Sequence, residues 1–550
     1  MKLIAPIMLL TFLMSCQEKI IYEPVKVPVE IQTKRQSLDK EELKNWYIKD
    51  LVDDTIPGIS LKKAFNTILK DRRGKEIIIA MLDMEVDIHH DKLEGSIWQN
   101  PNETLDGEDN DNNGYVDDVN GWNFLGDKNG QSNRFVNYEY TRVIRKFEPT
   151  FNHKIQSNIA QKDSFNFLVY QRAKEKHTAQ MLYAIQDKEY GQMLQNIVNI
   201  GKEALSPYFP DGEFTIKDLD SLKAVYPDHN TLQLEIKRMS NFKKYGYTEE
   251  YIKDYLIKAE ERLDKMLDLN YDDRVFVGDD SENINDTKYG NHILNSNTDL
   301  FKHGTKVAGV LAFFAEGNDY GDIKIMPLCI SSFGDEHDKD IALAMRYAVD
   351  NGAKVINMSF GKGFSLYKKW VDDALQYAEK NNVLVVTSVG NGGLLLDEIF
   401  NYPNDTNADN EEIVGNFIKV GASSYTLDTS LYSKFSNYGK REVDIFAPGN
   451  DLYTLLPKNI ESFDSGTSLA SGIVSGTAAL LFSFYPSLTA SEIKEIILES
   501  GLKYTHPVLV PTKEAPERQL PFNQLSKSGK IVNAYNAILM AEKMTKEKDK

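Results

Sequence analysis

The sequence has only two cysteines, Cys16 and Cys329, among its 550 residues. Two cysteines exclude a disulfide framework, so the fold must depend on hydrophobic packing. Apolar residues make up 41% of the chain and aromatic residues 11%, which is enough for a large core. Cys329 lies in the apolar run KIMPLCISS, and we expect it to be a small buried residue without a reactive role.

Long hydrophobic runs are also missing, because no stretch approaches the 18 apolar residues that a membrane-spanning helix needs. Near the start, Lys2 precedes an apolar run over 3–13, a pattern typical of a signal peptide. The next residues, LMSC, resemble the bacterial lipobox, in which the cysteine is acylated. This resemblance implies a signal peptide over 1–16 and a lipid anchor on Cys16. The alternative is an ordinary signal peptide with an incidental cysteine.

Residues 17–44 mix charges with prolines and lack periodicity, so we interpret them as a tether between the anchor and the folded part. The anchor implies a location outside the cytoplasm. Gln17, which directly follows Cys16 where an aspartate could stand, favours an outer membrane if the cell has two membranes.

Positive charge is in short supply, and the net charge is −18. This balance argues against nucleic acid as a partner, because binding to phosphates depends on basic side chains. It is consistent with a soluble protein that binds cations.

Glycine is scarce between about 135 and 270, where apolar residues recur at helical spacing. In 248–269 the apolar positions fall on one helix face, and 215–227 begins with a capping Thr215 and stops at Pro227. We expect four or five helices here. They would form an insertion over 131–271 between two parts of one larger domain, 45–130 and 272–540.

Outside this insertion, short β-branched runs alternate with helical segments. The runs EIIIAML, DIKIMPLCI, AKVINMSF, NVLVVTSVG, FIKVGASS and VDIFAPG are predicted strands, whereas 338–352 and 366–382 are predicted helices. This alternation predicts an α/β fold of three layers, with a mostly parallel central sheet covered by helices on both faces.

Chemistry-bearing residues stand where these elements end or begin. Asp83 ends the first strand, His303 starts an apolar helix, Asn391 follows a strand among glycines, and Ser468 lies in a glycine-bounded turn before a helix. A serine hydroxyl needs a base to become a nucleophile, and a histidine base needs an acceptor on its second nitrogen. Negative charge on an attacked carbonyl needs fixed donors. The chain offers one candidate for each role.

Four motifs in this order resemble those of subtilisin-like serine proteases, namely DMEVDIHHDKL, HGTKVAG, SVGNGG and SGTSLAS. Further similarity lies in 352–361, 432–449 and 485–498. The resemblance covers about 45–130 and 272–540, and implies the subtilisin-like fold and a serine endopeptidase acting on proteins or peptides. It assigns Ser468 as nucleophile, His303 as general base, Asp83 as its orienting partner, and Asn391 as an oxyanion-hole donor.

The same resemblance implies where substrate would bind. Ser359, Phe360 and Gly361 would form an edge that pairs with an extended substrate backbone. Gly390 and Gly392 would form part of the wall around the residue before the cleaved bond. No organic cofactor is implied.

A dense acidic loop follows in LDGEDNDNNGYVDDVNGWNF, residues 105–124. Ca²⁺ accepts six to eight oxygen ligands, and such a set of carboxylates would repel itself without a cation. The loop differs from an EF-hand, whose twelfth position would be Asn120 here rather than glutamate. It resembles the acidic loop of many bacterial subtilases, so we predict a structural calcium site, the alternative being a solvated acidic turn. The predicted ligands are Asp106, Asp109, Asp111, Asn113, Asp117 and Asp118.

The chain departs from the family pattern at three positions. Met84 and Glu85 follow the aspartate where the family usually has Thr or Ser and then Gly, and Gly472 replaces a usual proline. These departures leave open a first alternative, a catalytically weak or inactive binding protein. A second alternative is a narrow processing peptidase whose insertion recruits the substrate. The 220-residue separation of Asp83 and His303 is also unusually long. We hypothesise that the insertion lies near the active-site rim and restricts substrate entry, the alternative being an inert decoration.

Overall fold

The computed structural model describes residues 23–27, 38–314 and 323–548. The predicted signal peptide, Cys16 and residues 17–22 and 28–37 of the predicted tether lie outside the described residues. The predictions made for them therefore stay predictions.

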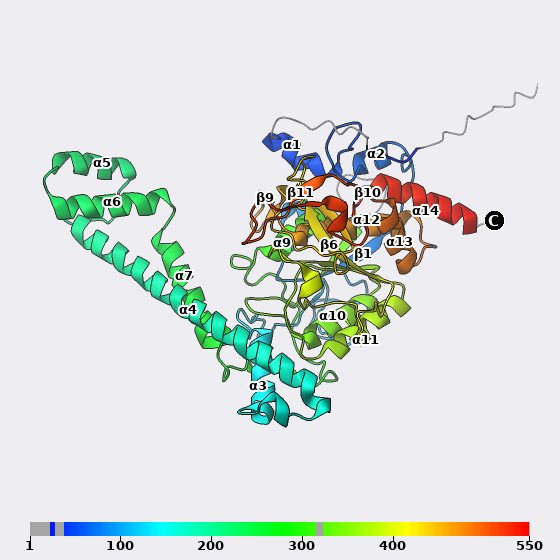
Figure 1. Cartoon of the computed structure of the whole chain (residues 1–550), viewed down its shortest axis with the longest axis horizontal. Helices are drawn as coiled ribbons and strands as arrows, with labels where there is room; N and C mark the ends of the chain where they lie inside the picture. Colours follow the sequence, from blue (N-terminus) through cyan, green and yellow to red (C-terminus); the bar gives the residue numbers. More distant parts are fainter. Residues whose placement is uncertain (1–22, 28–37, 315–322, 549–550) are drawn as a thin grey trace, which may run out of the picture.

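A nine-stranded sheet forms the centre of the molecule, in the order β10-β13-β7-β6-β5-β4-β1-β3-β2 (Figure 1). Its strand pairs are parallel except for β10 with β13. The strands are β1 Ile77–Asp83, β2 Trp122–Asn123, β3 Ile323–Cys329, β4 Val355–Met358, β5 Leu384–Ser388, β6 Phe417–Ser423, β7 Ile445–Pro448, β10 Leu502–Lys503 and β13 Lys530–Ile531. Two hairpins stand apart, β8 Leu452–Leu456 with β9 Ile460–Asp464, and β11 Pro507–Leu509 with β12 Gln519–Pro521.

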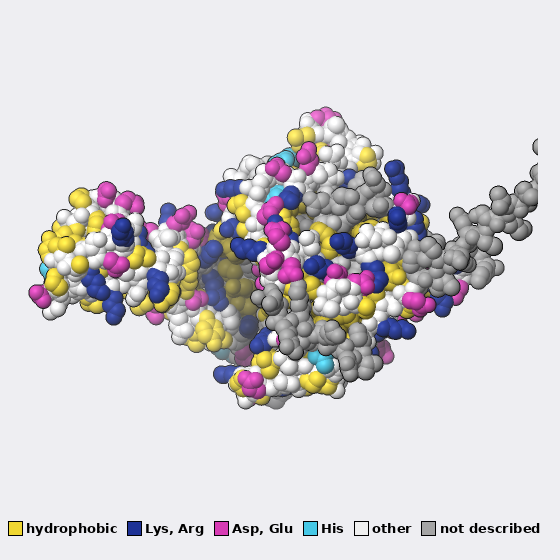
Figure 2. Space-filling model, turned by 90° about the horizontal axis from the view of Figure 1, so that it is seen from above, with side chains coloured by type: hydrophobic (Ala, Val, Ile, Leu, Met, Phe, Trp, Pro, Cys, Tyr) yellow, Lys and Arg dark blue, Asp and Glu magenta, His cyan; other side chains and the backbone are white. Residues whose placement is uncertain are grey.

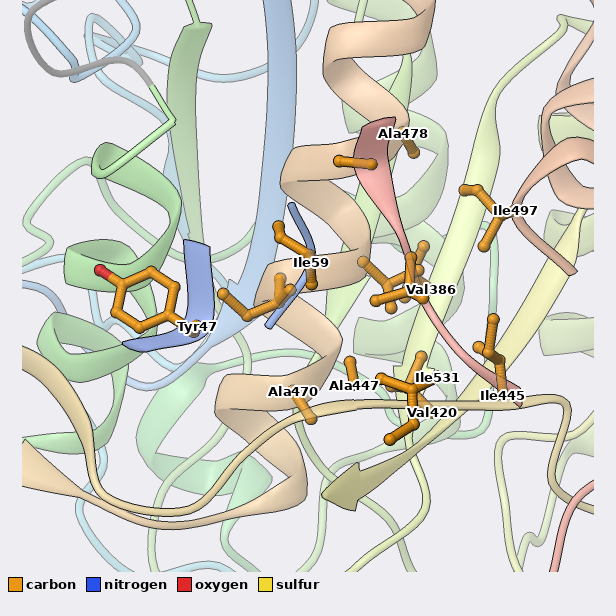
Figure 3. Packing of buried hydrophobic residues seen from close by; sticks show 14 of the residues in the cluster. Tyr47, Ile59, Val386, Val420, Ile445, Ala447, Ala470, Ala478, Ile497 and Ile531 are labelled. Carbon is orange, nitrogen blue, oxygen red and sulfur yellow. The ribbon is translucent and has the colours of Figure 1, made fainter. Parts of the chain in front are cut away.

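Helices cover both faces because successive side chains of a strand point to opposite sides. Along β1, Ile77, Ile79 and Met81 join one hydrophobic core, while Ala80 and Leu82 join the other. The first core also contains α9 His303–Ala312, α12 Thr467–Phe484, α13 Ala490–Ser500 and α14 Ala534–Lys548, and the second contains α10 Asp338–Asp350 and α11 Lys368–Lys380. Figure 3 shows the first core from close by, with Ala470 and Ala478 on α12. We call this sheet and the helices that cover it the body.

The predicted three-layer fold is confirmed. All six predicted strands are present, and 338–352 and 366–382 contain α10 and α11. Cys329 ends β3, is 1% exposed and is a free thiol, as expected. Among the described residues, α12 is the helix long and apolar enough to cross a membrane, but 94% of it is buried inside the body. It is therefore the central core helix.

The region between β2 and β3 contains the predicted helices. They are α3 Glu139–Phe151, α4 Ser164–Leu205, α5 Ile216–Val225, α6 Asn230–Lys244 and α7 Glu249–Glu261, the last continued by a π-helical turn, Arg262–Met266. Thr215 and Asp218 form a capping box at the start of α5. The 42-residue α4 leads away from the body and α7 returns along it, so that α4 to α7 form a projecting arm (Figure 1). In Figure 2 basic, acidic and apolar side chains are interspersed on the arm.

Shorter elements complete the chain. They are α1 Lys40–Asn45, α2 Leu61–Asn66, α8 Arg274–Val277, and the short 3₁₀ turns Trp46–Ile48, Asp91–Leu93, Gln156–Asn158, Gln161–Asp163, Leu396–Glu398 and Phe522–Gln524.

Candidate active site

Asp83 and His303 meet directly, although 220 residues separate them. His303 Nδ1 lies 2.6 Å from Asp83 Oδ1, which also accepts a hydrogen bond from the Met84 backbone N–H at 2.7 Å. Asp83 is 2% exposed, whereas the His303 ring is partly exposed. The Asp83 contact occupies Nδ1 and leaves His303 Nε2 as the nitrogen available to a nucleophile.

Local packing explains why these two side chains meet. β1 lies in the interior of the sheet between β3 and β4, and Asp83 is its last residue. His303 is the first residue of α9, and Gly304 follows it where an added Cβ would lie 2.5 Å from Met84 O and 2.6 Å from Glu85 O. Only glycine permits this close approach of α9 to the end of β1.

The electrostatics of the pair favour a charged histidine. Burial lowers the pKa of His303. The charge of the Asp83 carboxylate and the hydrogen bond to it raise the pKa by more than burial lowers it, so the pKa lies above the usual value. Asp83 Oδ2 is buried and has no hydrogen-bond partner among the described residues. The Met84 side chain, at the position where the family usually has a hydroxyl, cannot supply one.

Ser468 is the second residue of α12, which begins after Gly466 and packs against α9. Its hydroxyl donates a hydrogen bond to the Ser359 carbonyl at 3.1 Å, and the residue is 7% exposed. Gly472, one turn further along, faces α9, where an added Cβ would lie 3.2 Å from Val310 Cγ1. A small residue at 472 thus suits the close packing of the helix that carries Ser468 on the helix that carries His303.

Asn391 lies beside the start of α12 and is oriented by Thr467. The Thr467 backbone N–H and hydroxyl each donate to Asn391 Oδ1 at 2.9 Å, and Gly390 N–H donates to the Thr467 hydroxyl oxygen at 3.1 Å. With its oxygen held in this way, the amide group has Nδ2 available as a donor. A Cβ added at Gly466 would lie 3.7 Å from Asn391 Nδ2 and 3.8 Å from Ser468 N. The Asn391 Nδ2 and Ser468 N atoms therefore both lie close to the open side of Gly466.

The predicted substrate-binding residues lie around this space. Ser359 follows β4, and its side chain is buried. Its hydroxyl accepts a hydrogen bond from Asn357 Nδ2 at 2.9 Å and donates one to the Ser468 carbonyl at 3.1 Å. Phe360 is partly buried and packs against the second core, while Gly361 is exposed. Gly390 is partly exposed and Gly392 is exposed in the loop that also contains Asn391.

Two residues important to this geometry were missed by the sequence reasoning. Thr467 is one. The other is Asn437, whose Oδ1 accepts from the N–H groups of Gly392 and Leu394 at 3.1 and 2.9 Å, while its Nδ2 donates to Val389 O at 2.6 Å. Thr467 lies within the quoted serine motif, so its neighbours could have drawn attention to it. Asn437 had no comparable signal beyond its place in 432–449.

Glu85 gains a specific place in the structure. It is 1% exposed, and its carboxylate accepts hydrogen bonds from Ser296 Oγ at 3.0 Å, Asn297 N at 2.5 Å and Asn297 Nδ2 at 2.9 Å. The Val86 N–H donates to Leu294 O at 2.9 Å. Glu85 thus ties the end of β1 to the segment that leads to His303. His90, which stands near Glu85 in the sequence, is buried and caps the short turn Asp91–Leu93.

The acidic loop brings together only part of the predicted ligand set. Carboxylate oxygens of Glu103, Asp109 and Asp111 lie within 4.8 Å of one another. Asp117 instead accepts hydrogen bonds from the N–H groups of Asp106 and Gly107, both at 2.8 Å. The remaining predicted ligands also serve the loop itself. Asp106 accepts from Glu108 N, Asn113 accepts from Tyr115 N, and Asp118 accepts from Asn100, Asn113 and Tyr347.

Glu103 was not among the predicted ligands, because it precedes the acidic stretch. It is 7% exposed, and its Oε2 is buried without a hydrogen-bond partner among the described residues. Burial and the nearby carboxylates of Asp118 and Asp111 raise the pKa of Glu103. An unpartnered oxygen beside two other carboxylates fits a hard cation such as Ca²⁺.

The helices between β2 and β3 stand in two different relations to the site. The distal helices α5 and α6 lie at the far end of the arm (Figure 1). The residues before α3 contact the body, where Phe135 and Phe333 form a parallel β-bridge. The base of the insertion thus contacts the body, whereas its distal helices lie away from it.

Comparison with known proteins shows the family of the chain. Residues 74–519 match the model of the subtilase family. The chain belongs to the subtilase family. This is a family of serine proteases, and relatives of the chain are named as proteases. A cell wall-associated protease of Bacillus subtilis is 34% identical over 206 residues, which is 36% of this chain and 21% of the relative.

Subtilisin DY of Bacillus licheniformis is 34% identical over 208 residues, 36% of this chain and 69% of that protein. A thermophilic serine proteinase of a Bacillus species is 36% identical over 34% of this chain and 43% of its own length. The chain thus spans between about a fifth and two thirds of the length of these relatives. Among solved structures, a lanthipeptide protease matches with a TM-score of 0.34 and 27% identity, over 44% of this chain and 75% of its own.

Proposed function

We propose that the protein is a serine endopeptidase that hydrolyses peptide bonds with Ser468, His303 and Asp83. The observation that carries this proposal is the 2.6 Å contact of His303 Nδ1 with Asp83, because it leaves Nε2 to face a nucleophile. Ser468 at the start of α12, with Asn391 beside it, supports the assignment.

The reaction begins when Ser468 Oγ leaves the Ser359 carbonyl and attacks the substrate carbonyl carbon. His303 Nε2 accepts the hydroxyl proton and then delivers it to the leaving amine. Asp83 stabilises the imidazolium that exists between these steps, consistent with the raised pKa of His303. Water then attacks the acyl-enzyme and gives a proton to His303 Nε2, which returns it to Ser468 Oγ as the acid product leaves.

Negative charge develops on the substrate oxygen during both steps. The Asn391 side-chain amide and the Ser468 backbone N–H are the proposed donors to this oxyanion. Their common position around Gly466 supports the role, and any side chain at 466 would compete with the oxyanion for that space. The substrate backbone would pair with the edge 359–361, next to the wall that contains Gly390 and Gly392.

A fluorophosphonate probe tests the proposal, because it reacts covalently with an activated serine. The wild-type protein should be labelled, and Ser468→Ala should lose labelling without a change in melting temperature. Ser465→Ala is the matched control, since Ser465 is exposed three residues earlier, and it should be labelled normally. A folded wild-type protein that is not labelled would favour the second candidate function, a binding protein on the subtilase fold. The unpartnered Asp83 Oδ2 is the observation that motivates this second candidate.

The other alternative, a narrow processing peptidase, would use the same three residues but cleave few substrates. Profiling the cleavage of an unfolded protein separates the two, because a broad enzyme should cut at many sites and a processing enzyme at one or two. The side-chain preference follows from the same measurement.

We also propose that Glu103, Asp109 and Asp111 hold a structural Ca²⁺ ion, which would neutralise their charges and fix the acidic loop. Titration with Ca²⁺ in a calorimeter should give binding that Asp111→Asn weakens and that Glu108→Gln leaves unchanged. Glu108 is the control because it is an exposed carboxylate of the same loop. Equal binding to both variants would contradict the proposed site.

Finally, we propose that a lipid on Cys16 anchors the protein to a membrane outside the cytoplasm, with the outer membrane favoured where two membranes exist. The lipobox-like LMSC supports this location, and the net charge of −18 supports protein rather than nucleic acid as the partner. Metabolic labelling with a fatty-acid analogue should mark the wild type and not Cys16→Ala. Labelling of both would contradict the anchor.

A further inference from the structure

Lys362 is a buried charge next to the proposed substrate edge. It directly follows Gly361, and its side chain is fully buried. Its ammonium group lies 2.8 Å from Asp338 Oδ1 and 3.5 Å from Glu139 Oε1, and it donates to Glu336 O at 2.5 Å. A buried ammonium group requires such partners, so their positions determine where this end of the edge lies.

The main chain of Lys362 is fixed as well. Its N–H donates to Tyr402 O at 2.9 Å, and its carbonyl accepts from Tyr402 N at 2.8 Å. At the other end of the same segment, the Ser359 hydroxyl donates to the Ser468 carbonyl at 3.1 Å. The edge 359–361 therefore runs from Ser468 to Lys362. Hydrogen bonds fix its first end, and the ion pairs of Lys362 fix its last.

Glu139 connects this edge to the insertion. It is the first residue of α3 and is 2% exposed. Besides Lys362, its carboxylate accepts from Arg142 Nε at 2.7 Å and from Leu366 N at 2.7 Å. The positive charges of Lys362 and Arg142 lower the pKa of Glu139 to about 2 in spite of its burial, so it is ionised at neutral pH.

The same helix also holds the segment on the other side of the site. Arg142 donates to the carbonyls of Asp335 and Glu336 at 2.8 and 3.1 Å, and the Glu139 N–H donates to Asp335 Oδ2 at 2.8 Å. This segment starts beside the proposed triad, since Ser331 N–H donates to Asp83 O at 3.2 Å. The first turn of α3 thus contacts two segments of the body that flank the site.

We infer that Glu139 and Lys362 are positioning residues for substrate, which hold the edge 359–361 in place and make the base of the insertion part of the substrate-binding region. The inference rests on the proposed function, because it takes 359–361 as the edge that pairs with substrate. A long substrate needs the whole edge, whereas a fluorophosphonate needs only the activated serine. The pair should therefore affect the two reactions differently.

The experiment compares fluorophosphonate labelling with hydrolysis of fluorescein-labelled casein, in the wild type and Glu139→Gln. Labelling rates should agree within about twofold, while KM for casein should rise on the order of tenfold, because a small misplacement of a binding edge weakens substrate alignment. Glu235→Gln is the matched control. Glu235 is another buried glutamate that pairs with an arginine three residues later, but on α6 in the arm, and its substitution should change neither reaction.

Lys362→Met provides a second variant in case Glu139→Gln folds poorly, and melting temperatures check both. The double variant should raise KM no further than the larger single effect, whereas additive effects would overturn the pairing. Equal losses in labelling and hydrolysis, or no loss in either, would also overturn the inference.

If the wild type is not labelled, the proposed function fails by itself. Binding of labelled casein peptides to Ser468→Ala, with and without Glu139→Gln, then decides the inference, since equal affinities overturn it and weaker binding supports it.

Discussion

The body and the arm are stabilised in different ways. In the body, β1 lies between β3 and β4, and both of its faces lie in hydrophobic cores to which distant parts of the chain contribute. In the arm, α4 is accompanied in turn by α7 and α6, and the buried residues form small separate clusters. Two of the clusters are Leu194, Val198 and Ile252 in the middle, and Leu205, Phe214, Leu219, Leu232, Ile236 and Met239 at the tip. A third, at the base, includes Phe167, Tyr170, Ala173 and Ala184 of α4 and residues of α3.

Helix pairs in the arm approach closely where α4 has glycine. At Gly191 an added Cβ would lie 2.8 Å from Leu256 Cδ2, and at Gly201 it would lie 2.5 Å from Met239 Sδ. The arm thus depends on contacts between neighbouring helices, and the body on contacts between distant segments. Such a division allows the arm to unfold locally while the body keeps Asp83 and His303 in contact.

The largest expected difference between the two regions concerns catalysis. Asp83→Asn should lower kcat by about 10⁴-fold, because the amide cannot hold the required histidine tautomer. The melting temperature should remain close to that of the wild type. Glu235→Gln in the arm should leave kcat unchanged, as measured by peptide hydrolysis. Similar losses in both variants would contradict the assignment of the catalytic residues to the body.

Asn391→Leu should have the next largest effect. Loss of the side-chain donor should lower kcat by roughly 10²–10³-fold, as found for the oxyanion asparagine of another subtilase, with little change in KM. Thr467→Val should give a smaller loss in the same direction, since it removes the hydroxyl donor to Asn391 Oδ1 but keeps the backbone one. Steady-state kinetics measure both. A change confined to KM would mean that Asn391 binds ground-state substrate instead.

Core substitutions test the difference in stability. Ile79→Ala in β1 and Leu219→Ala in α5 each remove a fully buried side chain. Each should lower the free energy of unfolding of the region that contains it by about 2–5 kcal/mol. Ile79→Ala should lower the free energy of unfolding of the body and its melting temperature. Leu219→Ala should instead open the tip of the arm, seen as faster hydrogen exchange in α5 and α6, with labelling of Ser468 retained. Loss of labelling in Leu219→Ala would show that arm and body unfold together.

The smallest expected effect is a shift in pH dependence. His303 acts as a base only when neutral, and its pKa is raised, so kcat/KM should be full above this pKa and fall as the pH drops through it. Met84→Ser would supply a hydroxyl that donates to Asp83 Oδ2. This hydrogen bond should weaken the electrostatic stabilisation of the imidazolium by the carboxylate and so lower the pKa of His303. The fall of kcat/KM on the acid side should then move to lower pH by less than about one unit. Met84→Ala is the control without a hydroxyl. An unchanged or higher pKa in Met84→Ser would contradict this account.

The fold class and the candidate triad could be predicted from local sequence patterns. Strands such as 417–423 and helices such as 338–350 follow local patterns of apolar residues, and Asp83, His303, Asn391 and Ser468 stand at element ends where a parallel sheet gathers its site. Such signals lie within a few residues of one another, so they can be read without knowing what packs against them.

Contacts between groups far apart in the chain became known from the three-dimensional structure. Glu85 binds Ser296 and Asn297, more than 200 residues later, Asn437 holds the loop around Asn391, and Lys362 pairs with Glu139. Each of these side chains is polar, and a polar residue in a sequence is equally compatible with a solvated surface. Burial makes the difference, because a charge removed from water must find a partner, and the path of the chain in space determines which partner is within reach.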